Sequence, residues 1–157
     1  RFDDAWAAQL DRRTQRDGDH NSRQGDRSAG RIDASDDSHQ QAALREAHEE
    51  IGVEPESVRV LGQLEEMVTI SNYQVTPVVG VIPWPFAIDP QESEVARVFT
   101  VPLAWLAEPA HHEERQREIP GEQRSIGVHY FEKYDGELLW GVSARLMVNF
   151  LQALDLI

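Results

Sequence analysis

The feature that most limits what this chain can fold into is the uneven distribution of its apolar residues. Between residues 11 and 41 the only apolar side chains are Ala29, Ile32 and Ala34, and Gly, Ser, Asp, Asn and Arg predominate. Taken alone, such a segment buries too little apolar surface to offset the entropy lost on ordering, so its composition predicts a loop or a disordered stretch. The core must come from the remainder. Because 157 residues is a usual size for one domain, we expect residues 1–157 to form a single domain.

Net charge and residue usage exclude several classes of function. Lys and Arg number 15 against 28 Asp and Glu, and the resulting net charge of −13 opposes binding to nucleic acid unless cations intervene. The chain has no cysteine, so His and carboxylates are the usual metal ligands that remain. No apolar run approaches the roughly 18 residues needed to cross a bilayer, and no signal-peptide core is present at the start. We therefore expect a cytoplasmic protein with no membrane or nucleic-acid partner. Because the chain begins at Arg1 rather than at methionine, we expect further residues before it.

Periodicity predicts helices interleaved with strands. Leu44, Ala47 and Ile51 recur at helical spacing, which predicts a helix over residues 39–51, and Gly52 is suited to end it in a left-handed conformation. The residues available as its N-cap are Asp36, Asp37 and Ser38. The other expected elements are helices over residues 1–10, 102–107 and 142–154, a mostly antiparallel meander over 57–64, 66–70 and 73–82, a strand over 94–101, a polar loop over 108–123, and strands over 126–133 and 137–140 joined by a turn at Asp135-Gly136. This order predicts an α/β or α+β sandwich.

Three glutamates on the helix expected over residues 39–51 are the strongest candidates for chemistry. At 100° per residue, Glu46, Glu49 and Glu50 fall within a sector of about 100°, away from the apolar side of the helix. Like charges at these spacings repel one another, and the helix C-terminus disfavours anions. A positive partner is therefore expected, and a hard divalent cation such as Mg²⁺ suits carboxylate oxygens best. The ordinary alternative is a solvated acidic helix face.

The segment from Arg45 to Val53 resembles the second half of the Nudix box, which reads Arg-Glu-apolar-any-Glu-Glu-any-Gly-apolar, and it matches every fixed position. The resemblance implies an α/β/α sandwich with a mixed β-sheet. It also implies that Glu46, Glu49 and Glu50 bind Mg²⁺ or Mn²⁺, and that Arg45 orients them by ion pairing. In the first half of the box, Gly30 and Asp36 match the glycine and acidic positions, but eight residues rather than seven then precede Arg45. A one-residue insertion, or use of Asp37 instead of Asp36, would reconcile the spacing.

Segments outside the box look like the coenzyme A diphosphatase branch of the same superfamily. The likeness covers about residues 30 to 156, and its parts are Gly30-Arg31-Ile32-Asp33, Ala42-Ala43-Leu44, residues 73–80, Glu94-Val95, Val101-Pro102-Leu103 and Trp140-Gly141. It implies that Gly30 and Arg31 contact substrate. It also implies that a carboxylate outside the box, Glu94 or else Glu92, joins Arg45, Glu46 and Glu49 in catalysis. The ordinary alternative for Glu94 is a solvent-facing strand residue.

The upstream part of that branch's signature is where this sequence departs from the pattern. Arg27-Ser28-Ala29 runs straight into Gly30, and the apolar strand expected between the Arg-Ser and Gly-Asp ends is absent. A Nudix sheet without that strand would expose the apolar side of its neighbours. Two explanations are open. Either the natural protein has residues that this chain lacks, which we favour, or the protein is a degenerate family member.

The sequence thus supports a hydrolase that uses Mg²⁺ or Mn²⁺ to cleave the diphosphate linkage of coenzyme A or a derivative. The alternatives are hydrolysis of ADP-ribose or another nucleoside diphosphate derivative, and a Nudix-fold binding module without catalysis. The charged run His111-His112-Glu113-Glu114 could ligate a metal, but such a run in a polar loop is more often solvated. Trp84, Phe86, Trp105 and Tyr130 are interpreted as core or interface residues. The apolar helix near the C-terminus offers a surface for a homodimer.

Overall fold

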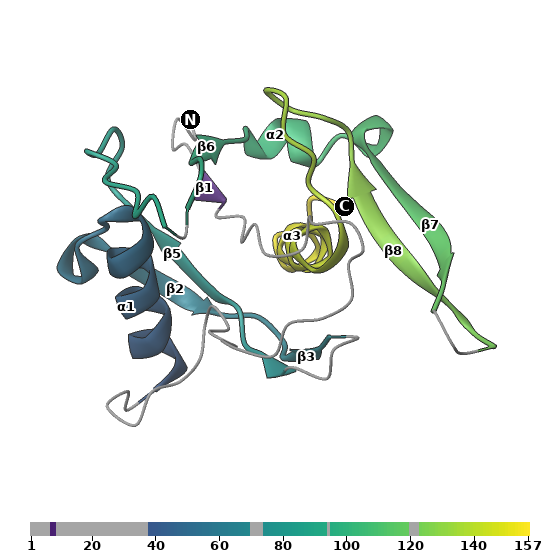
Figure 1. Ribbon diagram of the computed structural model, residues 1–157, viewed down its shortest axis with the longest axis horizontal. Coiled ribbons are helices and arrows are strands. Elements are labelled where there is room, and N and C mark those ends of the chain that lie inside the picture. The colour runs from purple at the N-terminus through teal and green to yellow at the C-terminus, as the bar shows by residue number, and fades with distance from the viewer. Residues whose placement is uncertain (1–6, 9–37, 70–73, 94, 120–122) are drawn as a thin grey trace.

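A computed structural model describes residues 7–8, 38–69, 74–93, 95–119 and 123–157 (Figure 1). Several sequence predictions concern residues outside these ranges. They are the roles of Gly30, Arg31, Asp36, Asp37 and Glu94, the loop or disorder expected over most of residues 11–41, and the strand missing upstream of Gly30.

The described residues form an α+β fold, as the sequence predicts. The elements, in chain order, are β1 (Ala7–Ala8), α1 (His39–Ile51), the 3-10 helix η2 (Pro55–Ser57), β2 (Arg59–Gln63), β3 (Met67–Val68), β4 (Gln74–Val75), β5 (Val78–Val81), β6 (Phe99–Thr100), α2 (Leu103–Leu106), the 3-10 helix η3 (Pro109–His111), β7 (His112–Glu118), β8 (Ser125–Phe131) and α3 (Gly141–Ala153). Every strand pair within the described ranges is antiparallel. No helix in these ranges combines the length and apolar character needed to span a membrane.

The expected meander is instead one long, irregular hairpin. β2 pairs with β5, and β3 pairs with β4 further toward the tip, so the pairs are nested rather than sequential. The Leu64 amide donates to the Pro77 carbonyl at 2.9 Å, and this bond continues the pairing from β2–β5 toward β3–β4. The meander prediction was wrong because short strands separated by polar residues give the same periodicity in both arrangements. In Figure 1 α1 lies beside this hairpin.

The prediction of a polar loop over residues 108–123 was also wrong in part, because residues 112–118 form strand β7. β7 pairs with β8 in unbroken register from His112↔Phe131 to Glu118↔Ser125. Backbone groups make these pairs whatever the side chains, so a charged sequence can form a strand at a sheet periphery. The strand expected over 137–140 is reduced to two isolated bridges, Tyr134↔Glu137 and Tyr130↔Trp140. Figure 1 shows the β7–β8 hairpin beyond α3, on the side away from α1.

Near the N-terminus the structure has a strand where a helix was expected. Ala7 and Ala8 pair with Thr100 and Phe99 of β6. A helix of about ten residues is marginal in water by itself, whereas pairing with β6 satisfies backbone groups directly. The rest of the expected helix lies outside the described residues.

Two apolar clusters hold the fold together. The larger joins α3 and β8 to the segment around α2, and its buried members are Phe99, Val101, Leu106, Phe131, Leu139, Ala144, Val148 and Leu151. The smaller lies at the end of α1 and has three buried members, Ile51, Val53 and Val95. The helix that carries the candidate carboxylates is thus anchored by the smaller cluster.

Candidate functional site

Helix α1 begins and ends at the residues that the sequence indicates. Of the three N-cap candidates Ser38 serves, because its hydroxyl accepts from the Gln41 amide at 3.2 Å. Gly52 ends the helix with φ of 74°, in the left-handed region that glycine adopts without strain, and its amide donates to the His48 carbonyl at 2.9 Å. The predicted helix over 39–51 is therefore confirmed.

Arg45 draws two of the three carboxylates together. Its Nη1 atom lies 2.9 Å from Glu46 Oε1 and 3.0 Å from Glu49 Oε2. A guanidinium group thus provides the positive partner that the repulsion between these glutamates requires. The expectation that Arg45 forms ion pairs with them agrees with this geometry.

The three carboxylates differ in their access to water. The Glu49 side chain is 52% exposed, the Glu46 side chain is 21% exposed, and Glu50 is 7% exposed as a whole residue. This order follows their angular order around the helix, because Glu46 lies between the other two and Glu50 borders the packed side. The expectation that all three carboxylates lie on the face away from the packed side is corrected for Glu50, which is buried. The sector runs from solvent at Glu49 into the protein at Glu50.

The loop after β5 covers the C-terminal end of α1. The Asp89 amide donates to the Ile51 carbonyl at 3.1 Å, and the Gln91 amide donates to the Glu50 carbonyl at 2.9 Å. These bonds satisfy carbonyls that the last turn of a helix leaves without an intrahelical partner. A Cβ atom placed on Gly52 would lie 3.0 Å from the Asp89 Cβ, so glycine also allows the loop to approach closely.

The chemistry of these side chains fits a hard divalent cation. Carboxylate oxygens are the donors that Mg²⁺ and Mn²⁺ prefer. Within the described ranges, no three or more His, Asp or Glu side chains are already gathered around one metal position. In this arrangement Arg45 holds Glu46 and Glu49, and Glu50 faces the interior.

The remaining sequence candidates lie near the end of α1 or outside the described residues. Glu92, the second choice for a carboxylate beyond the box, is exposed in the loop after β5. His48, for which no catalytic role is predicted, has its Nδ1 atom 3.2 Å from the Val53 carbonyl. Glu94, Gly30 and Arg31 are outside the described residues.

The charged run from His111 to Glu114 is divided by its local structure. His111 stacks on Trp105, with ring centroids 4.2 Å apart, and its Nδ1 atom lies 2.8 Å from the Trp105 carbonyl. The Nε2 atom of His112 lies 3.1 Å from Nδ1 of His129, and the adjoining Glu113 and Glu114 are exposed on β7. The four side chains therefore do not converge as one metal site.

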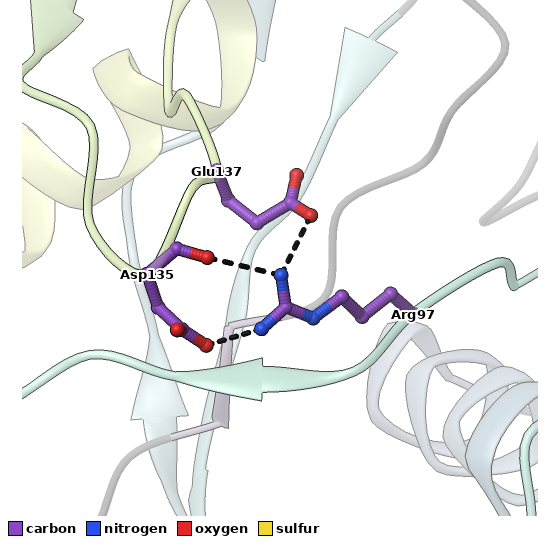
Figure 2. Close-up of polar contacts among 3 residues, drawn as sticks. All are labelled: Arg97, Asp135 and Glu137. Carbon is purple, nitrogen blue, oxygen red and sulfur yellow. Dashed lines mark hydrogen bonds and ion pairs between the residues drawn. The ribbon is translucent and has the colours of Figure 1, made fainter.

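Sequence reasoning missed an ion-pair network at the turn before α3 (Figure 2). Arg97 Nη1 donates to the Asp135 carbonyl at 3.0 Å and to Glu137 Oε1 at 3.1 Å, and Nη2 donates to the Asp135 carboxylate. The sequence revealed only the turn at Asp135-Gly136. Nothing local in it connects that turn to an arginine 38 residues earlier.

Comparison with known proteins agrees with the features of α1. Residues 12–123 match the family model described as the NUDIX domain. Over 118 residues the chain is 36% identical to the uncharacterized Nudix hydrolase NudL of Citrobacter koseri, 34% to that of Enterobacter sp. strain 638 and 35% to that of Escherichia coli K12. Each match covers 75% of this chain and 60% of the relative.

This chain belongs to the Nudix family. Its helix α1, with Arg45, Glu46, Glu49, Glu50 and Gly52, is the part of the family motif that the structure describes. Nudix enzymes generally need a divalent metal ion, in agreement with the donors on α1. The chain spans about 60% of the length of the curated relatives that it matches.

Proposed function

We propose that this chain is the catalytic domain of a Nudix hydrolase that cleaves the diphosphate linkage of coenzyme A or a derivative, giving 3′,5′-ADP and 4′-phosphopantetheine. The observation that carries the proposal is the pair of contacts from Arg45 Nη1 to Glu46 and Glu49, next to the buried Glu50, on a helix of the Nudix family. The segments that resemble the coenzyme A diphosphatase branch support this substrate. We place the enzyme in the cytoplasm, where it acts on a dissolved small molecule either alone or as a homodimer.

In this mechanism Glu46, Glu49 and Glu50 hold Mg²⁺ or Mn²⁺, and Arg45 orients their carboxylates. The bound metal would neutralise charge on the diphosphate and lower the pKa of the attacking water. Glu46 or Glu94 would accept the proton of that water. Gly30 and Arg31 would contact the substrate, as the resemblance implies. With a net charge of −13, the protein needs cations at its contact with a polyanionic substrate.

Glu49→Gln tests the proposal with little risk to folding, because the Glu49 side chain is 52% exposed. We expect kcat on coenzyme A to fall about 100-fold or more at saturating Mg²⁺, since the change removes a ligand charge and leaves the shape almost intact. Chelation of the metal should abolish turnover in the parent protein. Glu56→Gln is the matched control, because Glu56 is exposed in η2, beyond the end of α1.

The substrate is tested by parallel assays of coenzyme A, ADP-ribose and NADH with each metal. Faster turnover of ADP-ribose or NADH than of coenzyme A would select the alternative substrate class within the family. Turnover by Glu49→Gln equal to that of the parent would refute the assignment of this helix. Ligand binding without metal binding or turnover in the parent would instead identify a non-catalytic module.

A further inference from the structure

A cavity beside the end of α1 has the character of a small-molecule site. Its volume is about 520 Å³, and its walls come from three separate segments: Trp84 and Ile88 of the loop after β5, Val98, Phe99 and Thr100 at β6, and Tyr134 and Asp135 of the turn before α3. Trp84 and Ile88 are 41% and 36% exposed, so the fold leaves two large apolar side chains open at this place. We call this cavity the aromatic pocket. Apolar walls with a few polar groups are typical of ligand sites.

The polar groups of the aromatic pocket are available to a ligand. The hydroxyl groups of Thr100 and Tyr134 make no side-chain hydrogen bond to the described part of the chain. The Asp135 carboxylate uses Oδ2 to accept from Arg97, and Oδ1 has no donor within the same ranges (Figure 2). An unshared carboxylate oxygen at an aromatic wall is an acceptor for an N–H group on a planar ligand.

Arg97 fixes Asp135 and is itself neutralised. It binds both the carbonyl and the carboxylate of Asp135, and it also binds Glu137. Asp135 has a φ of 50° and Gly136 a φ of 83°, the left-handed conformation that an Asp-Gly turn adopts, and the bonds from Arg97 fix the Asp135 carboxylate beside it. The described wall residues include no cation, and the nearby Arg97 already contacts two carboxylates, so the described part of the aromatic pocket offers no unshared positive charge to a phosphate. It therefore suits the uncharged, hydrogen-bond-donating part of a ligand.

The loop that carries Trp84 and Ile88 connects the aromatic pocket to the carboxylate helix. Ile88 is followed directly by Asp89, whose amide donates to the Ile51 carbonyl. Val98, another wall residue, packs against the small apolar cluster that contains Ile51. A ligand whose charged part lies at α1 could therefore place its remaining part in this pocket.

We propose that the aromatic pocket binds the adenine ring of the substrate, with Trp84 against the ring face and Asp135 Oδ1 accepting from the exocyclic amino group. The inference rests on the proposed function in one respect: coenzyme A and ADP-ribose both join adenine to a diphosphate. The carboxylates around Arg97 repel phosphate, so the base occupies this pocket and the diphosphate remains at α1.

Binding of mononucleotides without metal tests the aromatic pocket separately from hydrolysis. Calorimetry in the presence of a chelator should show that AMP binds and that ribose 5-phosphate, which has no base, binds at least about tenfold more weakly, since stacking of a base on an aromatic ring is worth roughly 1–3 kcal/mol. Trp84→Ala should weaken AMP about tenfold, and Trp84→Phe should restore most of the affinity. Val68→Ala is the matched control, because Val68 is 65% exposed on β3 and does not line the pocket.

Asp135→Asn should shift the preference between AMP and IMP, a change that a merely structural role of Asp135 would not produce. IMP has a carbonyl where AMP has the exocyclic amino group, so the parent should prefer AMP to IMP. The amide introduced by Asp135→Asn keeps an oxygen for Arg97 and offers an N–H₂ group in place of Oδ1. The preference should therefore move toward IMP.

Equal affinities for AMP and ribose 5-phosphate, or an AMP affinity unchanged in Trp84→Ala, would overturn the inference whatever the result with coenzyme A. Loss of the AMP preference in Asp135→Asn, with AMP still weakened in Trp84→Ala, would support it. If AMP binds as expected but Glu49→Gln hydrolyses coenzyme A normally, the proposed function fails and the aromatic pocket remains.

Discussion

Helices α1 and α3 each have 13 residues, yet they are held in place in different ways. α3 contributes three residues to an apolar cluster with eight buried members, whereas α1 contributes Ile51 to a cluster with three. α1 also depends on contacts at its ends, namely the Ser38 cap, the Gly52 turn and the loop after β5. A helix that presents carboxylates along one sector has less apolar surface to bury. Helix α1 is thus held by hydrogen bonds at its two ends together with a smaller apolar cluster, whereas α3 is held by a larger one.

Truncation of one large buried side chain in each helix should give the largest difference in stability between the two helices. Leu151 in α3 is 0% exposed and Ile51 in α1 is 5% exposed. We expect Leu151→Ala to lower the free energy of unfolding by about 4 kcal/mol and Ile51→Ala by about 2 kcal/mol, because truncation in the larger cluster leaves a cavity with more packed walls. Urea unfolding at equilibrium measures both. Equal losses would contradict the difference in anchoring.

Two left-handed glycines test the close approach at the end of α1. Gly52 and Gly136 have φ values of 74° and 83°, but a Cβ on Gly52 meets Asp89 at 3.0 Å and one on Gly136 meets nothing within 4 Å. Alanine at Gly136 should cost about 1 kcal/mol from the backbone alone, and alanine at Gly52 about 2 kcal/mol. Thermal unfolding compares the two variants. A cost at Gly136 as large as that at Gly52 would show that contact with the loop adds nothing.

The cap at the start of α1 should have a smaller effect. Ser38→Ala removes the acceptor for the Gln41 amide and should lower the free energy of unfolding by about 1 kcal/mol. Gln40→Ala, an exposed change in the same turn, is the control. If denaturant midpoints of the two variants coincide, the cap does not contribute to anchoring α1.

The pH dependence of stability that comes from His112, on strand β7 of the β7–β8 hairpin beside α3, should be the smallest of these effects. Partial burial, together with the neighbouring His129, lowers the pKa of His112 below its ordinary value of 6.5. The folded protein then binds this proton less readily than the unfolded chain does, so the free energy of unfolding falls as the pH drops below about 6.5. His112→Gln should reduce this fall between about pH 7 and pH 5, as measured by thermal unfolding. Gln40→Ala, an exposed change at a side chain that does not ionise, should leave the fall unchanged, and an unaltered pH slope in His112→Gln would refute the assignment.

The sequence predicted structure best where local rules suffice. The limits of α1 follow from its apolar spacing together with Ser38 and Gly52, and the structure confirms them. β7 was missed because its side chains are polar and charged, which is typical of a loop, whereas its pairing with β8 is made by backbone groups. The nested order of β2 to β5 was missed because periodicity does not specify the partner of a strand.

In the candidate site, too, contacts within one helix could be predicted from the sequence, whereas those between distant segments could not. The contacts of Arg45 with Glu46 and Glu49 lie within one turn of helix, so residue spacing indicates them. The burial of Glu50 depends on what packs against the helix, and spacing alone left it equal to its neighbours. The walls of the aromatic pocket come from segments as far apart as Trp84 and Asp135, and only the folded chain brings them together.

The charged strand β7 has a consequence for how copies of this protein meet in a concentrated solution. Among the described strands β7 pairs only with β8, so no described strand pairs with its other edge. An open edge is a template for strand addition by a second molecule. Residues 113–118 are all exposed, and five of these six side chains are ionisable, so a second strand could pair here only by removing water from charged groups. The polar character of this segment thereby favours solubility over aggregation through the sheet edge.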